Sequence, residues 1–584
     1  MEEKIDSNTT IHIEQHFKII AGPGAGKTHW LTNHVKNVLQ NSTRLGRTAK
    51  IACITYTNVA SEEIRLRLGE TVGEKVEIGT IHNFLYKYIV KPYGFLLKDE
   101  EGINLINLEK MDGHDEHIPN ISIIKKWIDS ELGRRRFYLL NDDRIERFLQ
   151  CLKNFDWILE QDDCLNFQLR SEYKKTASNI RLPKLTQKQL LTYKKYYWNK
   201  GQIHHEDVLY LAYRILKEKP SVIKFLSYKF PYLFIDEFQD TNPIQTSIVR
   251  RLAAEKTIVG VIGDSTQSIY KFQGAKREDF EVFELNELKE YYMPDNRRST
   301  NNIVKFLQNI RDDELVQKAK KNREGAKVTV LVGDQSKALQ YVSKIDHKAC
   351  VLARNNETVR QLKYSSTQEL GDLWVRSRVI DSNFQRQMFI YYAVFAVELI
   401  EQKKYEEALS LMKKIFNYHA NGSKITQKKK RSFAIQTIER LYSLRNQNYK
   451  KTLYEYHNVT LEEILERFDV ESPSAKITKR GKKFFEFANQ YTYQHMVQSL
   501  RLQEDESLIR TIHKAKGCEF NTVLVVLEKK NLRYLFEPKI DSIDDDTRIL
   551  YVGFSRAKEK LYINIPYLAD DKHSILSECE IIDI

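Results

Sequence analysis

The sequence is poor in residues that cross-link or loosen a chain. Its 584 residues include 6 cysteines, 22 glycines and 11 prolines. No two cysteines have the C-x-x-C spacing of a zinc ribbon or an iron–sulfur cluster, so the sequence does not support such a site. Scattered cysteines in a long chain favour a reducing compartment. The low glycine and proline counts exclude a collagen-like or linker-dominated protein.

Signals for membranes and export are also missing. The sequence has no run of 18 apolar residues, so we expect no membrane span and no membrane partner. The first residues, MEEKIDSNTTIHIEQHF, are polar and acidic, which argues against a signal peptide. We therefore expect a cytoplasmic protein.

Hydrophobic and charged residues are balanced as in globular proteins, at 41% and 29% of the chain. Lysine and arginine total 93 against 79 aspartate and glutamate, which gives a formal net charge of +14. An excess of positive charge favours an anionic partner, with nucleic acid as the first candidate, although charge also serves solubility. The length predicts about three to five domains.

Short apolar runs alternate with helical patterns along the chain. The predicted strands are FKII (17–20), IACITYT (51–57), YLFI (232–235), IVGVIG (258–263), VTVLVG (328–333), TVLVVL (522–527) and KLYINI (560–565). Strands that alternate with helices predict parallel sheets covered on both faces. The last three runs are distant from the first four, which predicts a second α/β domain assembled from separate parts of the chain.

A glycine-rich loop, AGPGAGKT (21–28), lies between the first predicted strand and a predicted helix. Glycines let the backbone N–H groups of such a loop face a polyphosphate, and the helix N-terminus attracts negative charge. Lys27 can reach the β- and γ-phosphates, and the Thr28 hydroxyl can bind Mg²⁺. Ala21 occupies a position that is glycine in the strict pattern. The remaining predicted nucleotide-binding residues of the loop are Gly22, Gly24, Ala25 and Gly26.

Two adjacent acids end a strand in LFIDEFQD (233–240). In enzymes with a phosphate-binding loop, one acid holds the metal and a second orients or deprotonates the attacking water. Alone, Asp236 and Glu237 would fit a solvated acidic turn better than a catalytic site. Together with the loop they predict hydrolysis of a nucleoside triphosphate with Mg²⁺.

Six further runs accompany these two motifs. They are ITYTNVASEEI (54–64), IGTIHNF (78–84), VIGDSTQSIYKFQGA (261–275), DNRRST (295–300), TIHKAKGCEF (511–520) and RILYVGFSRAKEKL (548–561). In order and spacing, the eight motifs resemble the superfamily 1A DNA helicases of the UvrD, Rep and PcrA type, over nearly the whole chain.

The resemblance implies an α/β fold in which two RecA-like parallel-sheet domains face each other across ATP and carry two inserted helical subdomains. The implied boundaries are 1–90 and 201–303 for domain 1A, 91–200 for subdomain 1B, 304–370 and 500–584 for domain 2A, and 371–499 for a diverged subdomain 2B.

The resemblance also implies roles at the nucleotide site. Thr28 and Asp236 would bind the metal, and Gln267 would contact the γ-phosphate. Arg298 and Arg556 match two γ-phosphate arginines, and Glu519 matches an acid that binds the ribose. Two positions depart from the family pattern: His29 replaces an arginine, and Arg297 replaces a tyrosine that stacks on the base. His29 and Arg297 can still hold a purine between them by stacking. Gln15 lies too close to the loop for the adenine-reading glutamine of the family.

Seven residues match DNA-contact positions of the family. Aromatic faces stack on unpaired bases, and small polar groups hold phosphates, so this set suits a single strand. The residues are Tyr56, Thr57, Asn58, His82, Phe272, Thr511 and His513.

Two functions fit this sequence. The first is an ATP-dependent 3′-to-5′ translocase or helicase that acts on single-stranded DNA or a single-strand/double-strand junction. The second is suggested by a resemblance to the helicase-like GajB subunits of Gabija antiphage systems. Such a subunit would sense DNA and regulate a partner nuclease, an OLD-family, GajA-like ATPase–nuclease, with little unwinding of its own.

Overall fold

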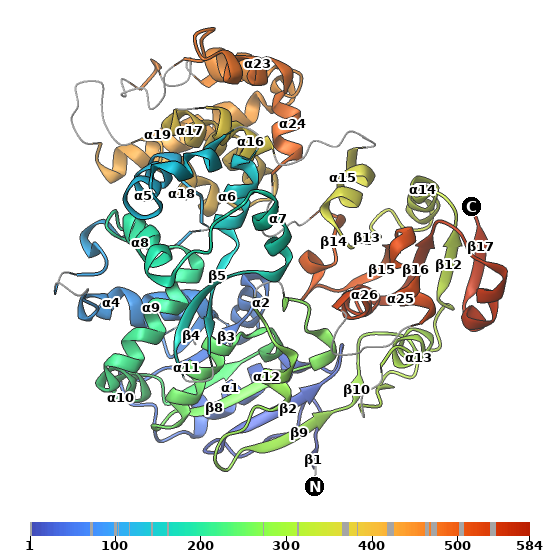
Figure 1. The fold of residues 1–584 in the computed structure, drawn as a ribbon. Helices are drawn as coiled ribbons and strands as arrows, with labels where there is room; N and C mark the ends of the chain where they lie inside the picture. The colour runs from blue at the N-terminus through green and yellow to red at the C-terminus, as the bar shows by residue number, and fades with distance from the viewer. Residues whose placement is uncertain are drawn as a thin grey trace.

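The computed structural model folds into two parallel sheets with helical segments inserted between their strands (Figure 1). It describes residues 3–69, 74–98, 102, 104–111, 113–115, 117–141, 144–160, 163–271, 274–311, 315–364, 373–381, 383–416, 425–461, 466–468, 476–500, 507–537 and 545–584. Among these residues no helix combines the length and the apolar character that a membrane crossing requires. All six cysteines are free thiols.

The first sheet has seven parallel strands in the order β1-β9-β2-β8-β7-β3-β4. The strands are β1 (Glu3–Lys4), β2 (Phe17–Ala21), β3 (Ile51–Thr55), β4 (Val76–Thr80), β7 (Tyr232–Ile235), β8 (Ile258–Gly263) and β9 (Lys289–Met293). The four predicted strands of this half are present, and the prediction for residues 51–57 ran two residues too far. β1, β4 and β9 were not predicted.

Both faces of this sheet are buried, which explains why its central strands are apolar throughout. On β7, Tyr232 and Phe234 belong to a core shared with α1 (Lys27–Asn41) and α2 (Asn58–Leu68). Leu233 and Ile235 belong to a second core on the other face. That core is covered by α3 (Ile81–Leu85), α9 (His205–Glu218), α10 (Pro220–Lys229), α11 (Pro243–Ala253) and α12 (Arg277–Glu281).

The second sheet has six parallel strands in the order β14-β13-β15-β16-β12-β17. The strands are β12 (Thr329–Val332), β13 (Cys350–Ala353), β14 (Ile509–Thr511), β15 (Phe520–Val526), β16 (Ala557–Ile565) and β17 (Glu580–Asp583). Helices of this lobe are α13 (Asn301–Gln308), α14 (Gln335–Ile345), α15 (Asn356–Tyr364), α25 (Arg533–Phe536) and α26 (Asp545–Phe554). A two-stranded piece, β10 (Asp295–Asn296) with β11 (Lys318–Ala319), lies on the segment that leads to it.

The inserted segment 91–200 is mainly helical, as predicted, but it also contains a hairpin that was not predicted. Its helices are α4 (Lys91–Tyr93), α5 (Ile121–Trp127), α6 (Ile145–Lys153), α7 (Lys174–Asn179) and α8 (Gln187–Trp198). The hairpin pairs β5 (Phe155–Leu159) with β6 (Leu165–Leu169) in antiparallel fashion. Trp157 of β5 stacks on Phe167 of β6 and on Tyr210 of α9, which anchors the hairpin to the first lobe.

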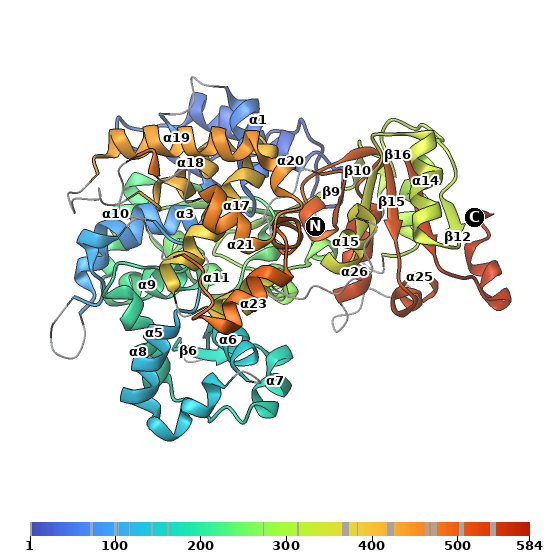
Figure 2. The same cartoon turned by 90° about the horizontal axis from the view of Figure 1, so that it is seen from above.

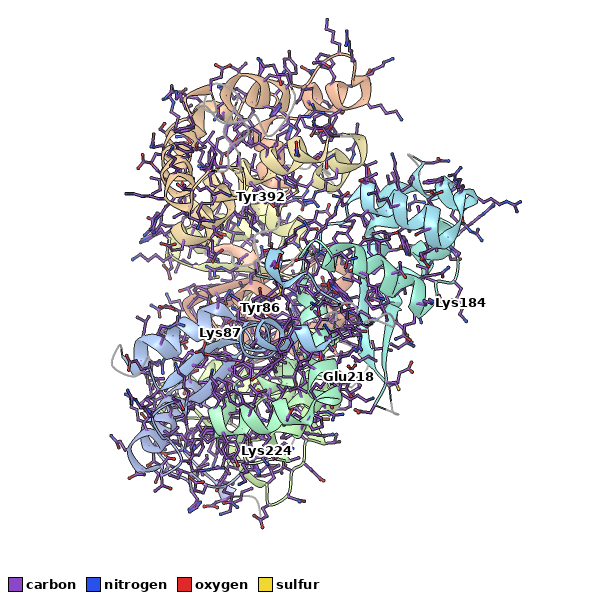
Figure 3. The ribbon with its side chains drawn as sticks, turned by 90° about the vertical axis from the view of Figure 1, so that its left-hand side faces the viewer. Tyr86, Lys87, Lys184, Glu218, Lys224 and Tyr392 are labelled. Carbon is purple, nitrogen blue, oxygen red and sulfur yellow. The ribbon has the colours of Figure 1, made fainter. Side chains whose placement is uncertain are left out.

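The described part of segment 371–499 is helical and has its own hydrophobic core. Its helices are α16 (Leu373–Ile380), α17 (Phe384–Glu401), α18 (Tyr405–Lys413), α19 (Gln427–Ser443), α20 (Arg445–Asn448), α21 (Leu453–Glu455), α23 (Lys482–Gln490) and α24 (Tyr493–Gln498). It meets the other insertion through an ion pair of 3.0 Å between Lys414 and Asp115. Figure 3 shows this helical body above the first lobe, with Tyr392 on it and Tyr86 below, and in the view from above of Figure 2 it lies in front of part of that lobe.

Candidate nucleotide and DNA site

The phosphate loop connects β2, which ends at Ala21, to α1, which begins at Lys27. Gly24 and Gly26 have φ angles of 71° and 89°, a left-handed backbone that glycine adopts without steric cost. The loop is closely enclosed: a Cβ atom on Gly24 would lie 2.6 Å from Asn296 Oδ1. Lys27 Nζ donates to the Ala21 carbonyl at 3.4 Å. The ammonium is therefore held at the mouth of the loop.

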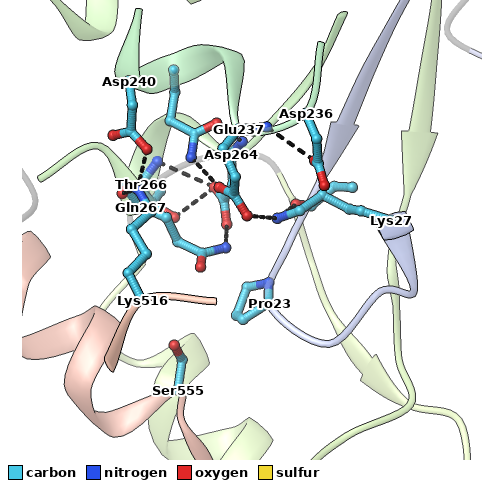
Figure 4. A network of polar contacts seen from close by, with 12 residues as sticks. Pro23, Lys27, Asp236, Glu237, Asp240, Asp264, Thr266, Gln267, Lys516 and Ser555 are labelled. Atoms are coloured by element: carbon cyan, nitrogen blue, oxygen red, sulfur yellow. Dashed lines mark hydrogen bonds and ion pairs between the residues drawn. The ribbon is translucent and has the colours of Figure 1, made fainter. Parts of the chain in front are cut away.

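The adjacent acids follow β7 and face the same lysine (Figure 4). Glu237 Oε1 lies 3.7 Å from Lys27 Nζ. Glu237 has a φ of 55°, a left-handed conformation that costs a non-glycine residue roughly 1–3 kcal/mol and clusters at functional sites. Burial and the Glu237 carboxylate raise the pKa of Asp236 to about 7. Burial would also raise the pKa of Glu237, but the positive charges of Lys27 and Lys516 have the larger effect and lower that pKa to about 2.

Gln267 joins the two lobes at this site. It follows β8, and its Nε2 donates to Asp264 Oδ2 at 2.7 Å. Its Oε1 accepts a hydrogen bond of 2.8 Å from Arg556 Nη2, which comes from the second lobe directly after α26. Burial and the charge of Arg298 lower the pKa of the Arg556 guanidinium to about 10. The side-chain amide of Gln267 thus connects a first-lobe carboxylate to a second-lobe arginine.

Arg298 and Glu519 form a second contact close to the loop. Arg298 Nε donates to Glu519 Oε2 at 2.7 Å, and Arg298 Nη1 donates to the Ser555 carbonyl at 3.0 Å. A Cβ atom on Gly24 would lie 2.7 Å from Arg298 Cβ, so this arginine borders the phosphate loop. Glu519, expected at the ribose, is 3.4 Å from Lys558 as well.

Lys516 is a cation of the site that was not predicted from the sequence. Its Nζ donates to the Gln267 carbonyl at 2.7 Å and pairs with the Asp240 carboxylate, both in the first lobe. Burial raises the pKa of Asp240 to about 6 in spite of this partner. Both residues lie inside motifs quoted above, but 276 positions separate them, so no local spacing indicates the pair.

The two predicted base-stacking residues lie beside the N-terminal segment. His29 is exposed, and its Nε2 lies 3.2 Å from Asn8 Oδ1. Arg297 donates its backbone N–H to the Gly24 carbonyl at 2.8 Å and pairs with Asp6 at 3.3 Å. Gln15, by contrast, donates to the Glu287 carbonyl. The chain thus gathers polar groups near the position expected for a base, and Gln15 is not one of them.

The predicted DNA-contact residues follow the carboxyl ends of strands in both lobes. Tyr56 follows β3 and lies 4.5 Å from Tyr270, measured between ring centroids. Thr57 caps α2 by accepting the Ala60 N–H, and Asn58 begins that helix in an exposed position.

The other predicted DNA-contact residues that the structure describes lie on α3 and around the end of β14. His82 lies on α3, where its ring is 6.0 Å from that of His205. Thr511 ends β14, and the His513 carbonyl accepts a hydrogen bond from the Tyr270 hydroxyl at 3.3 Å. Phe272 lies outside the described residues.

The residues at the loop have the chemistry that Mg²⁺ and a nucleoside triphosphate require. Mg²⁺ takes oxygen ligands, and Thr28 and the buried Asp236 supply a hydroxyl and a carboxylate. The buried Asp236 carboxylate lies next to the partly exposed Glu237 carboxylate, and burial together with this neighbour raises the pKa of Asp236, so a cation is favourable here. The left-handed loop glycines and the start of α1 offer backbone N–H groups to phosphate oxygens.

Comparisons with known proteins agree with this geometry. The family model described as the UvrD/REP helicase N-terminal domain matches residues 2–287, and the UvrD-like helicase C-terminal domain matches residues 396–566. The chain belongs to the UvrD/Rep family of ATP-dependent DNA helicases.

Curated relatives include the ATP-dependent DNA helicase PcrA of Staphylococcus epidermidis. It is 24% identical over 627 residues, which cover 93% of this chain and 80% of the relative. PcrA of Staphylococcus aureus is 22% identical over 632 residues, with the same shares covered. The UvrD-type resemblance and the two-sheet α/β fold predicted from the sequence are thereby confirmed.

Proposed function

We propose that this helicase couples hydrolysis of Mg-ATP to 3′-to-5′ movement along single-stranded DNA, starting at a single strand or a single-strand/double-strand junction. The observation that carries the proposal is the hydrogen bond of 2.8 Å between Gln267 and Arg556. This bond joins the two lobes beside Lys27 and Glu237. Hydrolysis of the bound phosphates would therefore alter contacts of both lobes. The direction of movement rests on the family resemblance.

Each residue of the nucleotide site has a separate role in hydrolysis. Lys27 and the loop N–H groups bind the phosphates, and Thr28 and Asp236 hold the metal. When bound, Mg²⁺ neutralises charge that develops on the phosphate oxygens. Glu237 orients the attacking water and accepts its proton, which its low pKa permits. Arg298 and Arg556 donate guanidinium hydrogen bonds to the transferring phosphoryl group.

Movement would use contacts on both lobes. Tyr56 and Asn58 lie on the first lobe and Thr511 on the second, so a strand that crosses them is held at two places. The lobes would close when ATP binds and open after hydrolysis. Each movement would release the DNA strand from one lobe while the other lobe still holds it. On the first lobe, stacking of a base on Tyr56 would contribute about 1–3 kcal/mol.

The test is steady-state ATP hydrolysis by the purified chain, with and without single-stranded DNA. Lys27→Ala serves as the control without nucleotide binding. Stopped-flow assays on strands that carry a fluorophore at the 5′ or the 3′ end then report direction. Strong stimulation by DNA and arrival at the 5′ end support the proposal, whereas arrival at the 3′ end contradicts the polarity.

The same experiment separates the alternative function. DNA-stimulated hydrolysis without displacement of an annealed strand would favour a DNA-sensing subunit that regulates a partner nuclease. A gene neighbour that encodes an OLD-family ATPase–nuclease would support that function further. Hydrolysis that DNA leaves unchanged would contradict both.

A further inference from the structure

A cluster of histidines and acids lies at the base of the inserted segment 91–200, on elements other than the strand ends of the nucleotide site. His117 precedes α5, and His204 and Glu206 lie at the start of α9. One ligand atom from each of these three residues lies within 4.8 Å of the others. The backbone brings them together through a parallel bridge between Asp115 and His204.

His117 leaves a ring nitrogen without a partner. The residue is 3% exposed, and its Nδ1 has no hydrogen bond, whereas its Nε2 lies 3.0 Å from the Tyr193 hydroxyl. When Tyr193 donates to Tyr197, 3.1 Å away, its oxygen accepts the Nε2 proton of His117. A buried lone pair then remains on Nδ1, and such groups normally have a partner.

The surroundings resemble those of metal-binding histidines. A ligating histidine usually contacts a carboxylate or another polar group through its second ring nitrogen, which fixes the ring. His204 Nδ1 lies 3.1 Å from Asp207 Oδ2, and the Tyr193 hydroxyl plays the same part for His117. Asp207 is itself fixed, because it accepts hydrogen bonds from the Trp198 indole at 2.9 Å and from the His204 backbone.

The charges of the cluster leave room for a cation. Lys194 Nζ lies 2.5 Å from Glu206 Oε1 and 2.9 Å from Asp207 Oδ1. The two carboxylates and the ammonium together carry one net negative charge in a largely buried place. Glu206 is the side chain of the cluster that can change its rotamer, because it is 19% exposed. Its Oε1 is 3.8 Å from His117 Nδ1. One of its oxygens can stay with Lys194 while the other turns to a metal.

We propose that His117, His204 and Glu206 bind one Zn²⁺ ion, with water as the fourth ligand. Zn²⁺ takes imidazole nitrogen and carboxylate oxygen at about 2.0–2.2 Å, which places tetrahedral ligand atoms about 3.3 Å apart. The separation of 3.8 Å between Glu206 and His117 reaches that value through a small side-chain rotation. The ion fixes the chain at His117 to the start of α9, and thus the insertion to the first lobe.

The test measures metal in the full chain after dialysis against metal-free buffer, by mass spectrometry of the elements. The variants are His117→Gln and, as the matched control, His114→Gln. His114 lies on the same segment but contacts His205 and Asn83. We expect about one zinc ion per chain in the parent and in His114→Gln, and loss of that ion in His117→Gln. Co²⁺ added to the metal-free protein should give visible absorption bands in the same two proteins only.

Stability provides a second measurement that does not depend on activity. A ligand that binds only the folded state raises the melting temperature, so a chelator should lower that of the parent by several degrees and leave His117→Gln unchanged. Glu206→Gln, whose amide can still accept from Lys194, covers the case in which His117→Gln fails to fold. A parent protein without zinc, without cobalt bands and without a chelator effect would overturn the proposal. Equal zinc in the parent and in a folded cluster variant would do the same.

Discussion

Replacement of Arg556 by alanine tests the arrangement of the nucleotide site most directly. The guanidinium donates to Gln267 Oε1 at 2.8 Å, to the Val552 carbonyl at 3.0 Å and to the Ser555 hydroxyl at 2.8 Å. The side chain is buried, so few other groups can take its place. Arg556→Ala removes all three contacts, of which the one to Gln267 crosses between the lobes.

The expected effect is large because the charge acts on the transition state. Arginines that stabilise a transferring phosphoryl group contribute about 10³–10⁵ in turnover. At 1.36 kcal/mol per factor of ten, this corresponds to about 4–7 kcal/mol of activation free energy. A hydrogen bond that involves a charged group, such as the one from Arg556 to Gln267, contributes about 1.5–3 kcal/mol. A loss of turnover of roughly 10- to 100-fold would therefore fit the Gln267 contact alone, and a loss of a thousandfold or more would require contact with phosphate.

The assay is single-turnover ATP hydrolysis at saturating DNA, with nucleotide affinity measured separately. Arg548→Ala is the matched control, because Arg548 is also a buried second-lobe arginine and donates to the Ser268 carbonyl at 3.1 Å. It should lose less than tenfold. Arg556→Lys should recover little, since an ammonium lacks the forked geometry of a guanidinium. Normal turnover in Arg556→Ala, or an equal loss in Arg548→Ala, would refute the assignment.

Three further predictions follow from the same contacts. Glu237→Gln should keep nucleotide affinity within a few-fold and lower turnover by about 10²–10⁴, as expected for loss of a general base; normal turnover would exclude that role. Lys516→Met should destabilise the protein by up to about 3–5 kcal/mol, because it leaves the Asp240 carboxylate buried and unpaired. The double variant with Asp240→Asn should unfold at a higher temperature than the single one, and if it does not, the pair is not coupled. Tyr56→Ala should weaken binding of single-stranded DNA by about 1–3 kcal/mol in a fluorescence titration, whereas Tyr56→Phe should bind normally; equal binding by all three proteins would contradict stacking.

The central strands could be predicted from the sequence because burial on both faces requires continuous apolar runs. YLFI and IVGVIG match β7 and β8 residue for residue. The edge strands and short strands escaped detection, since they are partly polar: β9 reads KEYYM and β4 reads VEIGT. The β5–β6 hairpin was also missed. Its apolar residues, such as Trp157, pack on α9 from a distant part of the sequence, and no local pattern reveals that partner.

The candidate site could also be predicted only in part. The loop and the acids next to it were found because their chemistry needs a fixed local spacing. The contact between Gln267 and Arg556 joins residues 289 positions apart, which no spacing rule predicts. Arg311 was missed for the same reason, although its guanidinium lies 3.2 Å from the Asp264 carboxylate. Burial would raise the pKa of Asp264, but the charges of Arg311 and Lys27 lower it to about 2. Charge pairs of this kind become visible only when the strand ends meet in space.

The structure also indicates why DNA and nucleotide are expected to affect each other. Tyr270, three residues after Gln267, packs against the tilted ring of Tyr56 and donates to the His513 carbonyl of the second lobe. Lys516 completes the connection, because its ammonium lies 5.1 Å from the Tyr270 ring centroid and binds the Gln267 carbonyl. Any shift of Gln267 toward a phosphate must therefore move groups that border the expected DNA path or break these buried contacts. Since the buried contacts are costly to break, movement of the lobes is the easier response.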